Sequence, residues 1–191
     1  ASDAPLVAAV QRAARQQGLP GALEGLSCWT DAALFSAATE VGGVIAGAPE
    51  DQVRALFDYG DALGIAFQIA DDLLDYGGSS AVIGKNVGDD FRERKLTLPV
   101  IKAVAKATPS EREFWRRVIE KGDQQDGDLE QAMALMDRHG TIASARTDAM
   151  DWASRAKAAL EALPPHPLRA MLSDRAGWGR FPDDVREWLE V

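Results

Sequence analysis

Residues 67–101 read FQIADDLLDYGGSSAVIGKNVGDDFRERKLTLPVI and place closely spaced acidic residues in an apolar segment of helical periodicity. Asp71 and Asp75 are separated by one helical turn, so a helix brings their carboxylates to one face, with roughly 6 Å between the Cβ atoms. Asp72 projects about 100° away around the same helix. Two carboxylates placed as Asp71 and Asp75 are can share one cation.

The residues around this acidic turn favour a metal and a phosphate. Acidic side chains on a buried helix face carry a desolvation cost that a positive group must offset, and hard oxygen ligands with room for water favour Mg²⁺. Lys85 and Lys95 follow the helix, where their ammonium groups can reach a phosphate. Gln68, one turn before Asp71, is placed to orient a carboxylate or to bind a ligand. The pattern therefore predicts a magnesium-bridged polyphosphate; the alternative is a solvated acidic face paired with arginines.

The composition narrows the class of protein. The length of 191 residues suits a single domain over residues 1–191. The formal net charge of -9 argues against nucleic acid as a partner, and the single cysteine, Cys28, excludes an intrachain disulfide and a cysteine-rich zinc site. No apolar run reaches the length that spans a membrane, and no signal peptide is recognisable. We therefore expect a soluble, cytoplasmic protein.

The periodicity predicts an all-α fold, because alanine, leucine, glutamate and arginine dominate and β-branched runs are short. We expect a loop over residues 77–94, and helices over residues 5–17, 31–46, 50–76, 97–107, 109–115, 128–138 and 141–163. Thr97 is expected to cap its helix, and Ser110 and Glu113 have the spacing of a capping box. Gly42 and Gly43 would let another helix approach closely.

The sequence also resembles a known family. GIAFQIADDLLDY (residues 64–76), followed by GKNVGDDFRERKLTLPVIKA (residues 84–103), is similar to the second aspartate-rich region of the trans-polyprenyl diphosphate synthases. The particular sequence resembles that of the long-chain octaprenyl and decaprenyl enzymes of quinone biosynthesis. The resemblance covers residues 32–172, which correspond to the C-terminal half of such an enzyme. Residues 1–31 and 173–191 diverge from it.

The resemblance implies a helical bundle with the isoprenoid synthase fold and a magnesium-dependent prenyltransferase. Members of the family elongate an allylic diphosphate with isopentenyl diphosphate: the allylic substrate ionises, the alkene adds, and a proton is lost. Carried over to this chain, Asp71 and Asp75 would hold Mg²⁺ against the allylic diphosphate, with Asp72 in support. Substrate contacts would come from Gln68, Lys85 and Lys95. Homodimers are common in the family, so the resemblance implies a homodimer here.

The sequence departs from the family in three places. The first aspartate-rich motif is absent, and Arg94, just before Lys95, replaces a glycine common at that point. In WTDAALF (residues 29–35), Thr30 stands where the family has a diphosphate-binding lysine and Asp31 where it has a threonine. We therefore interpret the chain as a truncated and impaired synthase. The alternative is a catalytically inactive helical partner, or diphosphate-binding relative, of a full-length synthase. The residues present do not define the product chain length.

Overall fold

The computed structural model describes residues 28–77 and 88–176, and within them it contains helices and no strand. The all-α prediction is confirmed. The helix expected over residues 5–17 and the predicted ligand Lys85 lie outside the described residues. The elements are α2 (Cys28–Ile45), α3 (Glu50–Gly77), α4 (Asp89–Arg92), α5 (Leu98–Lys106), α6 (Pro109–Trp115), the π-helix η1 (Arg116–Glu120), α7 (Asp128–Arg138), α8 (Thr141–Ala159), the 3₁₀ helix η2 (Leu160–Ala162) and α9 (Pro167–Arg175).

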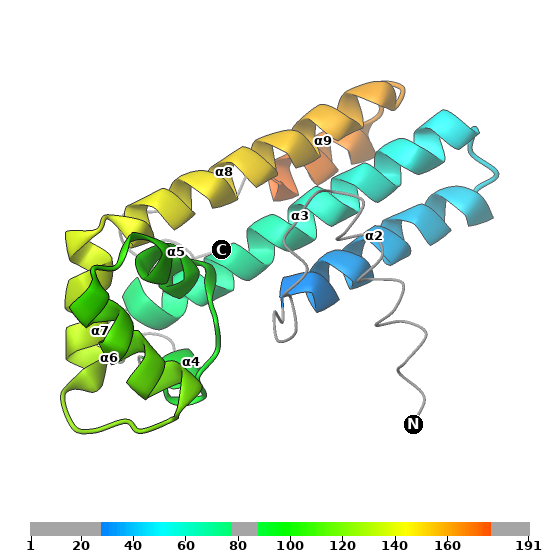
Figure 1. Cartoon of the computed structure of the whole chain (residues 1–191). Helices are drawn as coiled ribbons and strands as arrows, with labels where there is room; N and C mark the ends of the chain where they lie inside the picture. The colour runs from blue at the N-terminus through cyan, green and yellow to red at the C-terminus, as the bar shows by residue number, and fades with distance from the viewer. Residues whose placement is uncertain (1–27, 78–87, 177–191) are drawn as a thin grey trace, which may run out of the picture.

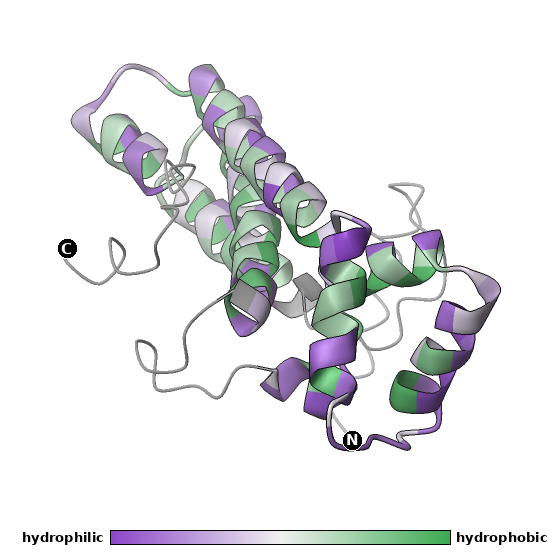
Figure 2. Cartoon of the chain, turned by 90° about the vertical axis from the view of Figure 1, so that its left-hand side faces the viewer, coloured by the Kyte–Doolittle hydropathy of each residue, from purple (hydrophilic) through white to green (hydrophobic). Residues whose placement is uncertain are grey.

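The long helix α3 is the centre of the bundle. It packs against α2 on one side and α8 on the other, and α9 contacts α8 (Figure 1). The short helices α4 to α7 gather at the end of the bundle where α3 ends, as both ribbon views show (Figures 1 and 2). None of the described helices is long and apolar enough to cross a membrane.

Small residues let α8 lie close to α3. Ala145 and Ala149 pack with Ile69 and Leu73 of α3 in one buried cluster. Further along α8, Ala156 lies with Tyr59 of α3 in a second cluster. These alanines are four and seven residues apart, so they lie on one face of the helix, and their short side chains let the two backbones approach.

Glycines of α3 set its close approach to α2. A Cβ added at Gly60 would lie 2.5 Å from the carbonyl oxygen of Phe35, and one added at Gly64 would lie 2.5 Å from the Cα of Ala32. The sequence prediction named Gly42 and Gly43 instead. Only Gly43 faces α3, where an added Cβ would meet side-chain atoms, whereas Gly42 has nothing within 4 Å. The close approach was therefore predicted correctly at one of these two positions, and Gly60 and Gly64 were missed.

The short helices enclose a separate core. Tyr76, Phe91, Val100, Trp115 and Met136 are among its buried members. Because Tyr76 is on the last turn of α3, this core fixes the acidic end of α3 relative to α4 and α5. The connection between η1 and α7 is polar, as its hydrophilic colouring shows (Figure 2), and most of its residues are exposed.

The capping predictions need correction. The capping box of α6 is formed by Thr108 and Glu111, with Pro109 in the first turn, and not by Ser110 and Glu113. Thr97 is the N-cap of α5 as expected, but its hydroxyl makes no capping bond. The Thr97 hydroxyl lies 3.2 Å from the hydroxyl of Tyr76. Two helices were also missed: α4 lies in the expected loop, and α9 follows the helix that was expected over residues 141–163.

Candidate metal and diphosphate site

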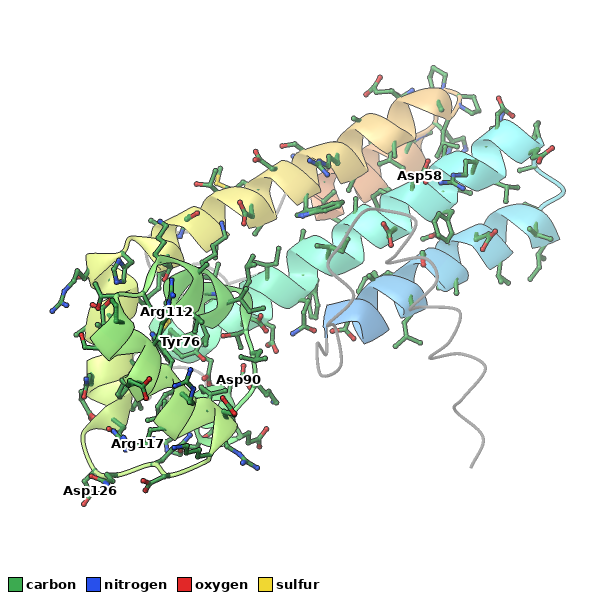
Figure 3. All side chains as sticks on the ribbon, viewed as in Figure 1. Asp58, Tyr76, Asp90, Arg112, Arg117 and Asp126 are labelled. Carbon is green, nitrogen blue, oxygen red and sulfur yellow. The ribbon has the colours of Figure 1, made fainter. Side chains whose placement is uncertain are left out.

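The last three turns of α3 carry the predicted acidic residues to the junction with α4 and α5. The labelled side chains Tyr76 and Asp90 mark this junction, and Asp58 lies toward the far end of α3 (Figure 3). The junction forms because the chain returns to α3: the N–H of Gly88 donates to the carbonyl oxygen of Asp75 at 3.0 Å. The N-termini of α4 and α5 are thereby brought next to the carboxylates of α3.

Asp72 is buried at the start of α5, with 5% of its surface exposed. Its carboxylate accepts hydrogen bonds from the side-chain amide of Gln68 at 2.9 Å and from the N–H of Leu98 at 3.2 Å. Burial raises the pKa of Asp72 to about 6, although both hydrogen bonds oppose that shift. Asp72 therefore joins α3 to α5, and Gln68 orients this carboxylate.

Asp75 is the equivalent link to α4. Its two carboxylate oxygens accept hydrogen bonds from the N–H groups of Asp89 and Asp90, at 3.2 Å and 3.0 Å. Burial, followed by the charge of Asp90, raises the pKa of Asp75. Each oxygen of a carboxylate has two lone pairs, so these bonds leave acceptor capacity on Asp75.

Lys95 is held at the edge of the junction by two acidic neighbours. Its ammonium group lies 2.7 Å from a carboxylate oxygen of Asp90 and 2.9 Å from one of Glu93. Hydrogen bonds to these two carboxylates raise the pKa of Lys95, so the group carries its charge. The preceding residue, Arg94, has a φ of 61°, which explains why glycine suits this position and shows that the arginine accepts the left-handed conformation.

The carboxylates at this junction are the type of oxygen ligand that Mg²⁺ takes. Asp71 is partly buried, and helical spacing puts it on the same face as Asp75. Within residues 28–77 and 88–176, however, no three acidic, histidine or cysteine side chains gather closely enough to form a metal cage. Mg²⁺ commonly uses one or two carboxylates and completes its shell with water and phosphate oxygens. Asp71 and Asp75 therefore suit a metal that a diphosphate shares.

The sequence analysis missed the supporting groups of this site. The backbone N–H groups of Asp89, Asp90 and Leu98 bind the acidic residues of α3, and no local pattern identifies such partners 14 to 26 residues away. The nearby pair of Tyr76 and Thr97 was also missed. Thr97, a polar residue two positions before Pro99, was the one available signal.

The comparisons with known proteins show the family. The model of the family described as polyprenyl synthetase matches residues 28–136. The chain is 41% identical to octaprenyl diphosphate synthase of Escherichia coli over 141 residues, which cover 74% of this chain and 43% of the relative. It is 37% identical over 146 residues to a short chain isoprenyl diphosphate synthase of Methanothermobacter thermautotrophicus, covering 75% of this chain and 44% of the relative.

Solved structures give the same result for the fold. A decaprenyl diphosphate synthase from Rhodobacter capsulatus superposes with a TM-score of 0.74 at 72% identity, over 80% of this chain and 47% of that one. A polyprenyl synthase from Caulobacter crescentus, complexed with calcium and isoprenyl diphosphate, gives a TM-score of 0.71 at 45% identity, over 78% of this chain and 45% of that one. The chain thus spans less than half the length of these relatives.

Proposed function

The chain belongs to the polyprenyl synthetase family, and on that premise we propose that it carries the second metal-binding region of a polyprenyl diphosphate synthase of the long-chain type. The reaction proposed is magnesium-dependent elongation of an allylic diphosphate with isopentenyl diphosphate, in isoprenoid and quinone side-chain biosynthesis. A cytoplasmic location stays a prediction. The acidic turn of α3, with its carboxylates held against the N-termini of α4 and α5, is the single observation that carries the proposal.

Each residue of the junction has a distinct part in this proposal. Asp71 and Asp75 would hold Mg²⁺, which when bound would offset the negative charge of the departing diphosphate. Asp72, oriented by Gln68, keeps the acidic turn in register with α5. Lys95, positioned by its ion pair with Asp90, would contact the diphosphate as a second positive charge.

The support from relatives concerns the ligand class. The Caulobacter crescentus polyprenyl synthase and a geranylgeranyl pyrophosphate synthase from Corynebacterium glutamicum were each solved with calcium and isoprenyl diphosphate. Both ligands match the chemistry of the junction, because calcium and magnesium both take oxygen ligands and Lys95 offers a cation to a phosphate.

The activity is tested by incorporation of labelled isopentenyl diphosphate into an allylic diphosphate, with magnesium. The expected result is incorporation by the wild-type chain that Asp71→Asn abolishes. Asp58→Asn is the matched control, because Asp58 is an exposed aspartate on the same helix, far from the junction (Figure 3). Incorporation that is equal in wild type and Asp71→Asn would contradict the proposal.

A second candidate function follows from residues 30 and 31. Thr30 and Asp31 replace a lysine and a threonine of the family pattern, which removes one positive charge and adds one negative charge where the resemblance implies diphosphate binding. This favours a catalytically inactive relative that binds diphosphate or pairs with a full-length synthase. Such a protein would bind an allylic diphosphate with magnesium and show no incorporation, even after Thr30→Lys and Asp31→Thr. Recovery of incorporation in that double variant would instead identify an impaired enzyme.

We also propose that the chain assembles as a homodimer through α2. The side chains of Leu34, Val41, Val44 and Ile45 are exposed, Ile45 by 81%, and their spacing places them on one face of the helix. A contiguous apolar stripe of this kind usually marks an interface.

A further inference from the structure

The short helix α4 is held on two sides. On one side, its first N–H groups donate to the carboxylate of Asp75. On the other side, three residues at spacings of three, Gly88, Phe91 and Arg94, lie against the segment 122–129, which runs from the connection after η1 into α7. This segment can therefore influence the position of Asp75 without contacting it, because α4 lies between them.

Gln124 makes the direct bond from this segment to α4. Its side-chain amide donates to the carbonyl oxygen of Phe91 at 2.8 Å and to that of Val118, in η1, at 3.1 Å. Both neighbours are acceptors, so the NH₂ group of the amide faces them and both of its N–H groups are used. Val118 is fully buried and gives the bond a fixed base. Gln124 thus ties α4 to the core of the short helices.

The main chain on either side of Gln124 is fixed by an ion pair. The guanidinium group of Arg117 makes two bonds to the carboxylate of Asp128, at 2.7 Å and 2.8 Å, and also donates to the carbonyl oxygen of Asp123 at 2.7 Å. The same carboxylate accepts the N–H of Gln125 at 2.7 Å. Two-point pairing of arginine with a carboxylate is directional, so the neighbours of Gln124 are held and its side chain is oriented toward α4.

Two glycines allow the flanking contacts. A Cβ added at Gly122 would lie 2.7 Å from the Nη1 atom of Arg94, so the arginine side chain lies over this glycine. A Cβ added at Gly88 would lie 2.4 Å from the side chain of Leu129 on α7. The arginine that departs from the family pattern therefore adds a contact between the segment and the residue before Lys95.

We propose that Gln124 is a positioning residue of the metal and diphosphate site: through the carbonyl group of Phe91 it holds α4 where the N–H groups of α4 orient the carboxylate of Asp75. The role assigned to Gln124 rests on the proposed function as far as the ligand is concerned, whereas its hold on α4 does not depend on a ligand. Gln124 itself contacts neither the metal nor the diphosphate.

The size of the effect is bounded by the bond itself. A residue that acts only by holding α4 can change the affinity for a ligand by no more than the stability of that hold. A hydrogen bond between neutral groups corresponds to roughly threefold to tenfold in an equilibrium constant. Gln124→Met keeps the length of the side chain and removes both donors. It is therefore expected to weaken the magnesium-dependent binding of geranyl diphosphate about fivefold, as measured by isothermal titration of the full chain.

Hydrogen exchange measures the hold on α4 without any ligand. In EDTA, the peptide spanning residues 88–95 of the full chain should exchange about fivefold faster in Gln124→Met than in wild type, because α4 opens more often. Gln124→Glu should accelerate exchange at least as much, since a carboxylate has the shape of the amide but offers no donor to the two carbonyl oxygens. The glutamate variant also replaces Gln124→Met if the latter does not fold, as judged by circular dichroism.

Arg169→Met is the matched control. Arg169, on α9, is partly buried and donates to the carbonyl oxygen of Leu163 at 2.9 Å, so its replacement removes a bond of the same kind away from the short helices (Figure 1). We expect this variant to lower the urea midpoint and to leave unchanged both the diphosphate affinity and the exchange of residues 88–95.

Three outcomes would overturn the proposal. The first is unchanged exchange over residues 88–95 in the folded variants of Gln124. The second is equal acceleration in Arg169→Met, which would indicate general destabilisation. The third is faster exchange with an unchanged diphosphate affinity, which would leave Gln124 a structural residue only. If the wild-type chain does not bind the diphosphate with magnesium, the proposed function fails, whereas faster exchange in Gln124→Met would still support the hold on α4.

Discussion

Replacing Gly64 by alanine tests the close packing of α2 on α3, which supports the whole bundle. The added Cβ would lie 2.5 Å from the Cα of Ala32, 2.8 Å from its nitrogen and 2.9 Å from the carbonyl oxygen of Asp31. Ordinary contact at such a position begins at 3.4 Å, so the closest approach is short by 0.9 Å (3.4 − 2.5). All three neighbours are backbone atoms and cannot rotate away. The methyl group can be accommodated only if α2 moves off α3.

Two opposing contributions set the magnitude. Alanine in place of glycine gains about 1 kcal/mol of helix propensity. Overpacking costs about 1–3 kcal/mol, and the upper part of that range applies because a helix must shift. The expected result is a net loss of about 1–2 kcal/mol in the free energy of unfolding, or a fall of about 0.5–1 M in the urea midpoint.

Gly42 provides the matched control. It is an exposed glycine in α2 with nothing within 4 Å of an added Cβ, so Gly42→Ala keeps the propensity gain without the clash. We expect Gly42→Ala to raise the free energy of unfolding by about 0.5–1 kcal/mol. Urea unfolding followed by circular dichroism measures both variants. If Gly64→Ala is as stable as Gly42→Ala, α2 does not pack on α3 as described.

Three further predictions concern ionisation and assembly. The pKa of Asp72, about 6 against a usual 3.8, means that the folded state binds more protons between pH 4 and 6 and loses stability as the pH rises through that window. Asp72→Asn should therefore stabilise the protein at pH 7 in EDTA by up to about 3 kcal/mol and have little effect below pH 4. If the urea midpoints of wild type and variant differ by the same amount at every pH in this range, that reasoning is wrong. The N–H of Thr108, and then His139, lower the pKa of Glu111 to about 2, so its contribution is present above pH 4.5 and is lost as the pH falls toward 2. Glu111→Gln should thus lower the melting temperature at pH 7 and converge with wild type near pH 2; a constant difference would exclude ionisation as the cause. Light scattering after size exclusion should give the mass of a dimer at low and at high salt, because salt screening has little effect on apolar contacts. Val41→Glu should give a folded monomer. A monomeric wild-type protein would contradict the α2 interface.

Helices with strong local signals were predictable from the sequence. The limits of α7 match the prediction, because a polar segment ending at Gly127 precedes it and Gly140 follows it. The capping box of α6 was misplaced by two residues, since two residue pairs share the required spacing. Pro109 decides between them: proline favours the first helical position, which makes Thr108 the N-cap.

Features that depend on distant residues were not predictable. The short helix α4 has four residues and begins where the Asp75 carboxylate, 14 residues earlier, accepts its first N–H groups. The spacing of Asp71 and Asp75 identified the acidic face, but nothing local showed that Asp72 would bind the start of α5. The glycines of α3 likewise act only because α2 lies against them. In each case the local sequence supplies one of the two interacting groups, and the tertiary fold determines which distant group it contacts.

The central claim is that the acidic turn of α3 binds a diphosphate through magnesium. Isothermal titration of geranyl diphosphate into the full chain, with magnesium and with EDTA, tests it most directly. We predict saturable binding that requires magnesium, is weakened at least tenfold by Asp71→Asn, and is unchanged by Asp58→Asn. Binding of equal affinity in EDTA, or in Asp71→Asn with magnesium present, would contradict the claim.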